Sequence, residues 1–233
     1  MFASETYISY PNYFLETTVS AARVTSPRPG RAAKPGRRAA GRILEPVPVL
    51  LETARMSLRS FTADDVDHLY NLNGDPDVMR FLTGGEPTPR DEVRDRIIPF
   101  FLGFYSNHAG LGFWAAETKP GGDFLCWFHL RPAGGGDVDL GYRLRKAAWN
   151  QGYATEGSLA LIGKCFTELG VPRVVAHTMA VNLASRRVME KCGLRFAGSR
   201  PSADLPDIPG AEQGEVEYAL TREQWQATAQ PPR

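Results

Sequence analysis

The sequence predicts an α+β fold in which helices flank a mixed, mostly antiparallel central sheet. Short segments alternate apolar and polar residues, as half-buried strands do, and several segments between them place apolar residues at helical spacing. In addition, glycine-rich links join three consecutive strand-like segments, which is typical of an antiparallel meander. The predicted order is one strand, two helices, three strands, a helix, a strand, a helix and two strands.

The first predicted strand spans residues 56–61, and Thr62 after it is a predicted helix N-cap, with Asp65 three residues further on. The helix that follows has an apolar stripe, and residues 73–76 end it. A second helix begins at residues 89–92 with acidic residues in its first turn, where they complement the helix dipole. Pro99 is expected to kink this helix. The apolar face of the first helix comprises Val66, Leu69, Tyr70 and Leu72. That of the second helix comprises Val93, Ile97, Phe100, Phe101 and Phe104.

The predicted meander consists of strands 113–117, 124–130 and 138–144. Residues 153–169 then form a predicted helix that ends at Gly170. A strand at 174–178 and a short helix at 183–191 follow, and Gly193 ends that helix. Residues 194–198 and 215–220 are the last predicted strands. The apolar face of the 153–169 helix comprises Leu159, Ile162, Phe166 and Leu169.

The domain organisation follows from a change in composition near residue 50. Residues 51–233 are predicted to form one globular domain, since the chain as a whole is 42% hydrophobic and 23% charged. Residues 1–50 are predicted to be a disordered extension, because residues 25–41 are rich in Pro, Gly, Ala and Arg and lack an apolar period. An Arg-rich, acid-poor arm could bind RNA or act as a transit peptide. A plain flexible tail and a misassigned start upstream of Met56 stay open as alternatives.

Charge and cysteine usage exclude several classes of function for the domain. Residues 1–50 hold seven Lys/Arg and three Glu, which gives this segment a net charge of +4. The remainder of the chain has a net charge of −3, so nucleic-acid binding is not expected outside the extension. Three cysteines without metal or redox spacing are expected to be reduced thiols in the cytoplasm, and no metal site is predicted. No apolar run approaches the roughly 20 residues of a membrane span, so no membrane partner is expected.

The chemically informative stretch is residues 140–195. A predicted strand ends at Leu144, and a turn containing Gly152 leads into the helix that begins near Tyr153. Such a turn presents free backbone N–H groups at the positive end of a helix dipole, which suits a pyrophosphate. Gly152 would let a phosphate approach the backbone, since it has no Cβ. From these residues alone, an ordinary turn remains the alternative.

With its downstream context, this stretch resembles the GNAT superfamily of acetyltransferases. The acyl-CoA motif of that family, Gln/Arg-x-x-Gly-x-Gly/Ala, is matched by Trp149-Asn-Gln-Gly152-Tyr-Ala154. Trp149 departs from the general motif at its first position. A tryptophan at that position resembles the branch that includes the ribosomal-protein N-terminal acetyltransferases (RimJ/RimL type). Residues 182–196 resemble that branch's Asn-x-x-Ser helix and its Gly-Phe/Leu-x-Phe exit. Phe81 and the tail 216–221 also fit, so the resemblance covers about residues 51–226.

The resemblance implies the GNAT acyl-CoA N-acyltransferase fold, with acetyl-CoA lying in a gap between two splayed strands. Pantetheine would then bind the main chain of the strand that ends at Leu144, and the pyrophosphate would meet N–H groups at the start of the next helix. Asn182 and Ser185 would line the pantetheine arm and the thioester. The implied cofactor-binding residues are Tyr142, Arg143, Leu144, Gln151, Gly152, Tyr153, Ala154, Thr155, Asn182 and Ser185.

The implied reaction is direct attack of a primary amine on the thioester of acetyl-CoA through a tetrahedral intermediate. The amine must lose a proton before it attacks, and the leaving thiolate gains one. The resemblance implies Ser185 as the proton donor, and Asp139 is a candidate base acting through water. The alternatives stay open: Asn182 only caps a helix, Ser185 only occupies its first turn, and Asp139 is a solvated strand residue.

The acceptor amine is either a protein N-terminal α-amine or the amine of a small molecule. A non-catalytic acyl-CoA-binding or sensor domain is the competing function, and Ser185 together with an acid in the acceptor cleft favours the enzyme. His129 and His177, alone on their strands, are expected to be structural or surface residues. Glu217 could orient the substrate or pair with an arginine. Both a monomer and a homodimer are compatible with the family.

Overall fold

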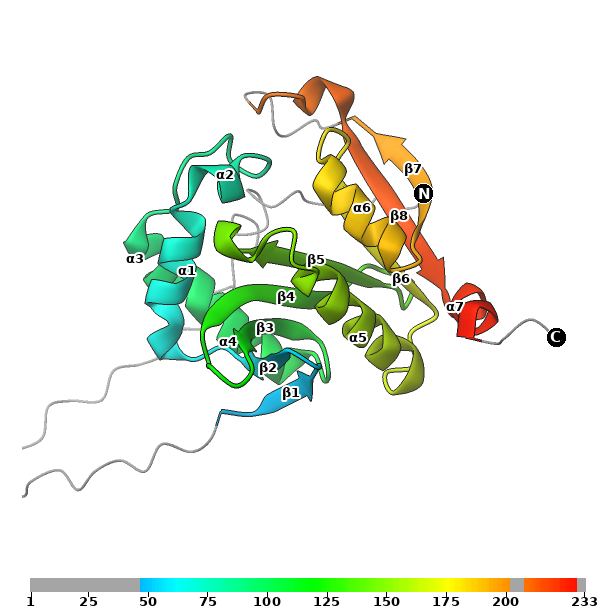
Figure 1. Cartoon of the computed structure of the whole chain (residues 1–233), viewed down its shortest axis with the longest axis horizontal. Helices are drawn as coiled ribbons and strands as arrows, with labels where there is room; N and C mark the ends of the chain where they lie inside the picture. Colours follow the sequence, from blue (N-terminus) through cyan, green and yellow to red (C-terminus); the bar gives the residue numbers. More distant parts are fainter. Residues whose placement is uncertain (1–46, 202–207, 230–233) are drawn as a thin grey trace, which may run out of the picture. The chain divides into compact units, whose positions relative to one another are not determined.

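The computed structural model describes residues 47–201 and 208–229, which form an eight-stranded sheet with helices on both faces (Figure 1). The strand order is β1-β2-β3-β4-β5-β6-β8-β7, and β5 and β6 are the parallel pair among antiparallel neighbours. The strands are β1 Val49–Glu52, β2 Met56–Ser60, β3 Gly112–Thr118, β4 Phe124–Pro132, β5 Val138–Leu144, β6 Arg173–Met179, β7 Arg195–Arg200 and β8 Glu215–Thr221. The helices are α1 Val66–Asn73, α2 Pro76–Met79, α3 Arg90–Glu92, α4 Ile98–Asn107, α5 Tyr153–Thr167, α6 Leu183–Lys191 and α7 Arg222–Ala229.

The predicted fold class is confirmed, and the meander of β3, β4 and β5 is antiparallel as expected. Thr62 caps the first helical segment: its hydroxyl accepts a hydrogen bond from the Asp64 amide, and the Asp65 carboxylate accepts one from the Thr62 amide. A 3₁₀ turn at Ala63–Asp65 precedes α1. The predicted extension lies almost entirely outside the described residues, and so do the roles considered for it.

The structure adds three elements that the sequence patterns did not predict. Strand β1 pairs antiparallel with β2 and begins at Val49, inside the segment predicted as extension. Helix α2 lies where only a turn was expected, with Pro76 at its start and Asp75 as its N-cap. Helix α7 follows β8. Each is short, and a run of four to eight residues gives periodicity little room to develop.

Two predicted helices differ in detail from the structure. The segment after Pro89 is α3, then a π-helical turn at Val93–Ile97, then α4, so the irregularity lies just before Pro99. In α5, Leu159 is 48% exposed and does not belong to the buried face. Leu161 and Cys165 belong to it instead, because the buried stripe runs 154, 157/158, 161/162 and 165/166.

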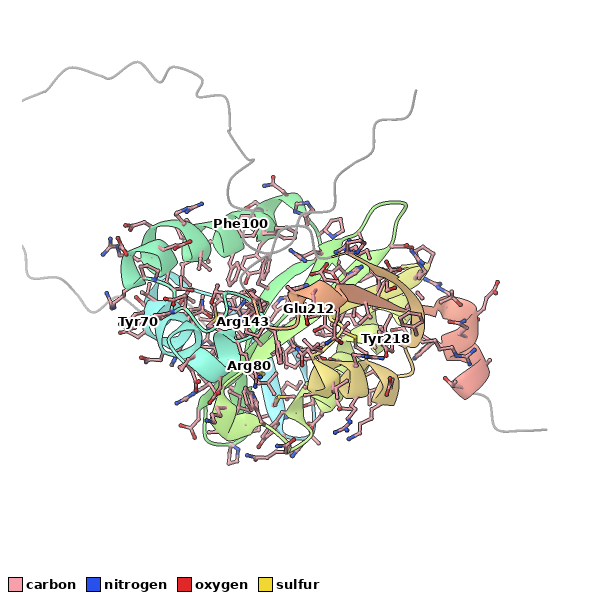
Figure 2. All side chains as sticks on the ribbon, turned by 90° about the horizontal axis from the view of Figure 1, so that it is seen from above. Tyr70, Arg80, Phe100, Arg143, Glu212 and Tyr218 are labelled. Carbon is pink, nitrogen blue, oxygen red and sulfur yellow. The ribbon has the colours of Figure 1, made fainter. Side chains whose placement is uncertain are left out.

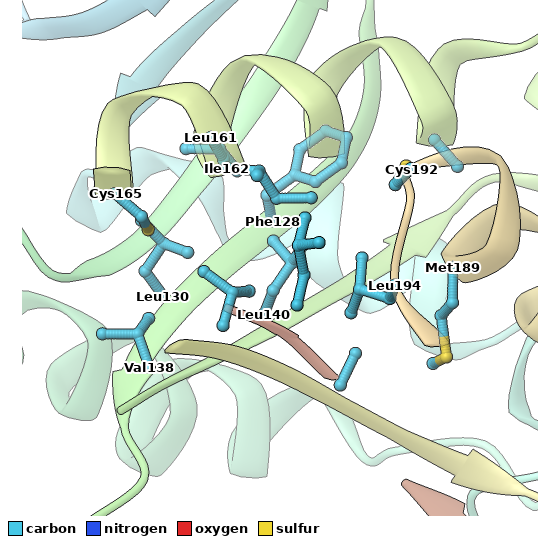
Figure 3. Packing of buried hydrophobic residues seen from close by; sticks show 14 of the residues in the cluster. Phe128, Leu130, Val138, Leu140, Leu161, Ile162, Cys165, Met189, Cys192 and Leu194 are labelled. Carbon is cyan, nitrogen blue, oxygen red and sulfur yellow. The ribbon is translucent and has the colours of Figure 1, made fainter. Parts of the chain in front are cut away.

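Side chains alternate between two faces of the sheet. On the α4 face, the rings of Phe113 and Trp127 lie against Phe101, with centroids 4.0 Å and 5.8 Å away. On the α5 face, Leu161 and Ile162 cover Phe128 and Leu130 (Figure 3). Helices α5 and α6 lie in front of the sheet in Figure 1. The two faces therefore bury separate cores, and a ligand between strands could be reached from either face.

Helix α5 approaches the sheet closely at Gly157, where a Cβ would lie 2.3 Å from Cζ of the buried Phe128. We expect Gly157→Val to lower the free energy of unfolding by about 2 kcal/mol, because overpacking outweighs the gain from removing a helical glycine. Urea unfolding followed by circular dichroism measures this change. Gly163→Ala on the same helix is the control, since nothing lies within 4 Å of its Cβ position, and it is expected to be neutral or stabilising.

Strands β5 and β6 separate soon after they meet. Their register has two pairs, Val138 with Val174 and Asp139 with Val175, while β5 stays paired to β4 as far as Leu144. Residues 141–144 therefore have β4 on one side and no partner strand on the other. We call the opening between residues 141–144 and 176–179 the β5–β6 gap.

Candidate active site

The β5–β6 gap borders a narrow apolar crevice on the α5 face of the sheet. The lining comprises Leu140, Tyr142, Ser158, Ala176, Val188, Met189, Cys192 and Leu194. These residues come from β5, β6, α5, α6 and the link to β7, and Figure 3 shows Leu140, Met189, Cys192 and Leu194 converging there. The hydroxyl of Ser158 is buried next to the Cys192 thiol. Its lining is mainly apolar with few polar atoms, which is typical of the walls of ligand sites.

The N-terminus of α5 has the features predicted for an anion cradle. Gly152 is its N-cap in the left-handed conformation, with φ of 83°, and no side chain caps the helix. The Glu156 amide donates the first intrahelical bond, to the Gly152 carbonyl, so the amides of Tyr153, Ala154 and Thr155 have no acceptor within the helix. Three N–H groups and the positive end of the helix dipole thus point at one place, which suits a phosphate.

The loop between β5 and α5 is held in place by its own side chains. The Trp149 indole donates to the Leu144 carbonyl at 3.0 Å, and the Gln151 amide donates to the Ala147 carbonyl at 2.6 Å. Asn150 also adopts a left-handed conformation, with φ of 58°. The tryptophan that departs from the general motif therefore has a structural role here: it ties the end of β5 to the cradle.

Arg55 lies over the cradle, and the sequence analysis missed it. Its Nε donates to the Glu156 carboxylate at 2.6 Å and its Nη1 to the Gln151 carbonyl at 3.0 Å. The guanidinium carbon is 4.3 Å from the centroid of the Tyr153 ring, and Nη2 is 3.5 Å from where a Gly152 Cβ would lie. Burial opposes ionisation of Glu156, but hydrogen bonds from Thr53 and Arg55 lower its pKa. Arg55 is thus a fixed positive charge beside the predicted phosphate position.

We expect Arg55→Met to weaken CoA binding about tenfold, the effect of losing one charged hydrogen bond. Affinity for pantetheine, which has no phosphate, should not change. Calorimetric titration of the full chain with both ligands measures this. Arg90→Met removes an equally exposed arginine that pairs with Asp67, far from the cradle along the chain, and serves as control. Equal losses for CoA and pantetheine would show that Arg55 acts only through folding.

Two hydroxyl groups meet where the crevice reaches α6. The Tyr142 hydroxyl lies 3.1 Å from Oγ of Ser185 and donates to the Ser185 carbonyl at 3.2 Å. Burial raises the pKa of Tyr142, so its phenol keeps its proton at neutral pH. Asn182 is the N-cap of α6, and its side-chain oxygen accepts from the Ser185 amide at 3.2 Å. The structure therefore brings Tyr142, Ser185 and Asn182 together beside the β5–β6 gap.

Arg143 points away from these groups. Its Nη1 donates to the Asn73 side chain at 2.6 Å, and its guanidinium carbon lies 5.3 Å from the Trp127 ring centroid. Figure 2 shows Arg143 in the interior of the molecule beside α1. This contact joins β5 to the end of α1. The Arg143 side chain is therefore engaged within the fold, and the backbone role predicted for this residue stays a prediction.

Asp139 is not a solvated strand residue: it is 4% exposed and lies on the α4 face. One carboxylate oxygen accepts from His129 at 3.0 Å and from Arg131, and the other faces Nδ1 of His177 at 3.3 Å. Burial alone would raise the pKa of Asp139, but the two histidines and Arg131 hold it well below its usual range. Asp139 is therefore a buried, ionised carboxylate with both oxygens occupied.

An open groove of about 580 Å³ lies at the ends of α1 and β5. It is lined by Tyr70, Asn71, Gly74, Asp75, Pro76, Asp77 and Lys146. Tyr70 is 38% exposed and faces this groove rather than the core predicted for it. Nearby in sequence, Phe81 packs against Met179, Ile208 and Ala211. The segment that follows α2 thus packs against the end of β6.

Within residues 47–201 and 208–229, no group of three or more His, Cys, Asp or Glu is arranged to hold a metal ion. No helix in the same ranges is long and apolar enough to cross a membrane. The thiols of Cys126, Cys165 and Cys192 are free and buried, and burial raises the pKa of each. These cysteines are therefore packing residues.

Comparison with known proteins identifies the family. Residues 55–195 match the acetyltransferase (GNAT) domain model. Over 190 residues, the chain is 31% identical to the FsC-acetyl coenzyme A-N(2)-transacetylase of Aspergillus fumigatus, covering 78% of this chain and 80% of that protein.

Solved structures share the fold at lower identity. Spermidine N-acetyltransferase from Vibrio cholerae, in complex with CoA and spermine, has a TM-score of 0.61 and 14% identity, covering 73% of this chain and 98% of that one. RimL, the ribosomal L7/L12 alpha-N-protein acetyltransferase in complex with CoA, has a TM-score of 0.64 and 16% identity, covering 75% and 98%. The chain therefore belongs to the GNAT family and is an N-acetyltransferase whose acetyl donor is acetyl-CoA.

Proposed function

We propose that the protein transfers the acetyl group of acetyl-CoA to a primary amine, by direct attack at the β5–β6 gap. The observation that supports this most strongly is the separation of β5 from β6 directly beside the uncapped N-terminus of α5. The free edge of β5 offers main-chain groups to an extended pantetheine arm, and Gly152 to Thr155 offer amides to the pyrophosphate. The ten residues predicted to bind acetyl-CoA are the ones we propose for this role.

For the acceptor, we propose an α-amine, whether on a peptide N-terminus or on a small molecule. The Aspergillus relative is named for an N(2) acceptor, which in an amino-acid derivative is the α-nitrogen. The RimL-type branch, also named for an α-amine, remains our proposal for the peptide case. Asp75 in the groove favours a cationic acceptor, since ammonium groups are attracted to acidic side chains, whereas Asp77 is already paired with Lys146 there.

The chemistry proposed for Ser185 is proton donation to the leaving thiolate, with Tyr142 beside it. A thiolate released in an apolar crevice is stabilised by a nearby O–H donor more strongly than it would be in water. Both hydroxyls are present and hydrogen-bonded to each other. A pure acyl-CoA sensor would have no need of such a pair, so the pair favours the enzyme over the non-catalytic alternative.

The experiment is CoA release by the full chain, followed with a thiol-reactive dye. The panel contains an α-amino acid derivative, a polyamine, and peptides with free or blocked N-termini. We expect release to be stimulated by free α-amines and not by the blocked peptide. Stimulation by the polyamine alone would overturn the α-amine assignment. Tight binding of acetyl-CoA without release by any amine would favour the sensor.

A further inference from the structure

Four titratable side chains form a chain across the α4 face of the sheet, each on a different strand. They are His129 on β4, Asp139 on β5, His177 on β6 and Glu217 on β8. The Nε2 of His129 is 3.0 Å from Asp139, Nδ1 of His177 is 3.3 Å from Asp139, and Nε2 of His177 is 3.2 Å from Glu217. Glu217 is 35% exposed, and the other three side chains are mostly buried. The chain therefore runs from the interior to the surface.

His177 borders the β5–β6 gap. Asp139 pairs with Val175 in the last register position before the strands part, so Gly141 and His177 are level with each other across the gap. His177 shares the α4 face with Met179, which packs against Phe81. Tyr142 and Ser185 lie on the opposite, α5 face. Groups that can donate or accept a proton thus lie on both faces of the sheet beside the gap.

The space for this chain is built into β5. A Cβ on Gly141 would lie 2.2 Å from the His129 ring, so a glycine is required where that ring crosses β5. Arg131 forms an ion pair with Asp139, and Arg173 lies 3.7 Å from the Glu217 carboxylate. Arg200, on β7, is another positive charge near His177. The side chains around His177 are therefore two carboxylates at its ring nitrogens and cations behind them.

These contacts give the two histidines opposite behaviour. Burial, together with Arg131, lowers the pKa of His129 to about 4, so it stays neutral. Burial also disfavours the charged form of His177, but hydrogen bonds to Asp139 and Glu217 outweigh burial and raise its pKa. Of the two, His177 is therefore the one whose protonated form the surrounding groups favour.

We propose that His177 accepts the proton that the acceptor ammonium must lose, with Asp139 positioning its ring and Glu217 drawing the ammonium in. This inference rests on the acetyl transfer proposed above. It reassigns Asp139, a candidate base in the sequence analysis, to a positioning role, because its carboxylate lies at the buried end of the chain of four, whereas His177 contacts the partly exposed Glu217. With Nδ1–H donated to Asp139, Nε2 lies 3.2 Å from the Glu217 carboxylate, on the side of the ring away from Asp139.

One N–H proton of the ammonium passes to Nε2 of His177, and the freed nitrogen lone pair forms a bond to the thioester carbon. As the tetrahedral intermediate collapses, the carbon–sulfur bond breaks and the thiolate takes the proton of the Tyr142–Ser185 hydroxyl pair. The second N–H proton of the nitrogen replaces it. His177 then returns its proton to water by way of Glu217, so one proton is released for each acetyl group transferred.

The first test is independent of turnover. Imidazole NMR titration of the full chain, with His177→Gln used for assignment, should place the pKa of His177 above its ordinary value. Glu217→Gln should lower it by roughly half a unit, since one partly exposed carboxylate is lost. His68→Gln, on α1 outside the chain of four, should leave the titration of His177 unchanged. A His177 pKa that does not respond to Glu217→Gln would overturn the proposal.

The second test uses the acid limb of the pH profile of kcat/KM. Removing a carboxylate lowers the pKa of the base, so Glu217→Gln should move the acid limb to lower pH. His177→Gln should lower kcat about 100-fold at pH 7 with an alkyl amine, while acetyl-CoA affinity is unchanged. A fluorinated acceptor that is already neutral at pH 7 should react nearly as fast with His177→Gln as with the wild type. A merely structural histidine would slow both acceptors equally.

The two proposals fail in different ways. If the wild type binds acetyl-CoA but no amine stimulates release, the acetyl transfer itself is refuted. If the wild type is active and His177→Gln retains its rate and pH profile, the role of His177 alone is refuted.

Discussion

Gly152→Glu is expected to abolish measurable binding of acetyl-CoA by the full chain. The new side chain would start at a position with φ of 83°, which costs a non-glycine residue about 1 kcal/mol. Its carboxylate would also lie at the uncapped amides of α5, where a carboxylate competes with phosphate for the same donors. We expect an affinity loss of at least about 100-fold in calorimetric titration.

Two controls separate charge from strain. Gly152→Ala brings the backbone strain without the carboxylate and should lose much less affinity than the glutamate variant. Gly122→Glu puts the same residue at a glycine with φ of 74° in the β3–β4 turn, where a Cβ meets nothing within 4 Å. It should bind acetyl-CoA like the wild type. Normal binding by Gly152→Glu would contradict the assignment of the cradle.

Ser185→Ala is expected to lower kcat about 100-fold while leaving the dissociation constant of acetyl-CoA unchanged. The hydroxyl is proposed to protonate the leaving thiolate, which matters only after the substrates are bound. Alanine keeps the helix cap intact, because the Ser185 amide rather than its hydroxyl donates to Asn182. Stopped-flow measurement of CoA release at saturating acceptor gives kcat directly.

The Tyr142 phenol affects how the rate of the Ser185→Ala variant is interpreted. Tyr142 lies 3.1 Å from the Ser185 hydroxyl, so Tyr142→Phe and Ser185→Ala should not be additive in the double variant. A double variant no slower than Ser185→Ala alone would show that the two hydroxyls act as one donor. If the double variant keeps the wild-type rate, neither hydroxyl protonates the thiolate.

The sequence predicted those parts of the molecule that depend on neighbours in the chain. The alternation of strands, the capping box at Thr62 and the glycine before α5 are all local patterns, and the structure shows each of them. The wrong assignment of Leu159 to the core has a local cause as well. Several apolar or small residues in α5 fit more than one helical stripe, and the sheet decides which stripe is buried.

The remaining features depend on contacts that no local pattern encodes. Arg55 meets Glu156, 101 residues away, because the β1–β2 turn lies over the start of α5. The His129–Asp139–His177–Glu217 chain requires the strand order β4-β5-β6-β8, in which β8 inserts between β6 and β7. The sequence left Asp139 open as a candidate base or a solvated strand residue, since only the neighbouring strands show that its carboxylate is buried and paired.

A crystal structure of the full chain with CoA locates the cofactor relative to α5 and the β5–β6 gap. We predict that the pyrophosphate accepts hydrogen bonds from the amides between Gly152 and Thr155, with Arg55 beside it. The pantetheine arm should run along the free edge of β5 in the β5–β6 gap and bring the sulfur towards Tyr142 and Ser185. CoA bound elsewhere, with the gap closed and these amides facing water, would contradict the account.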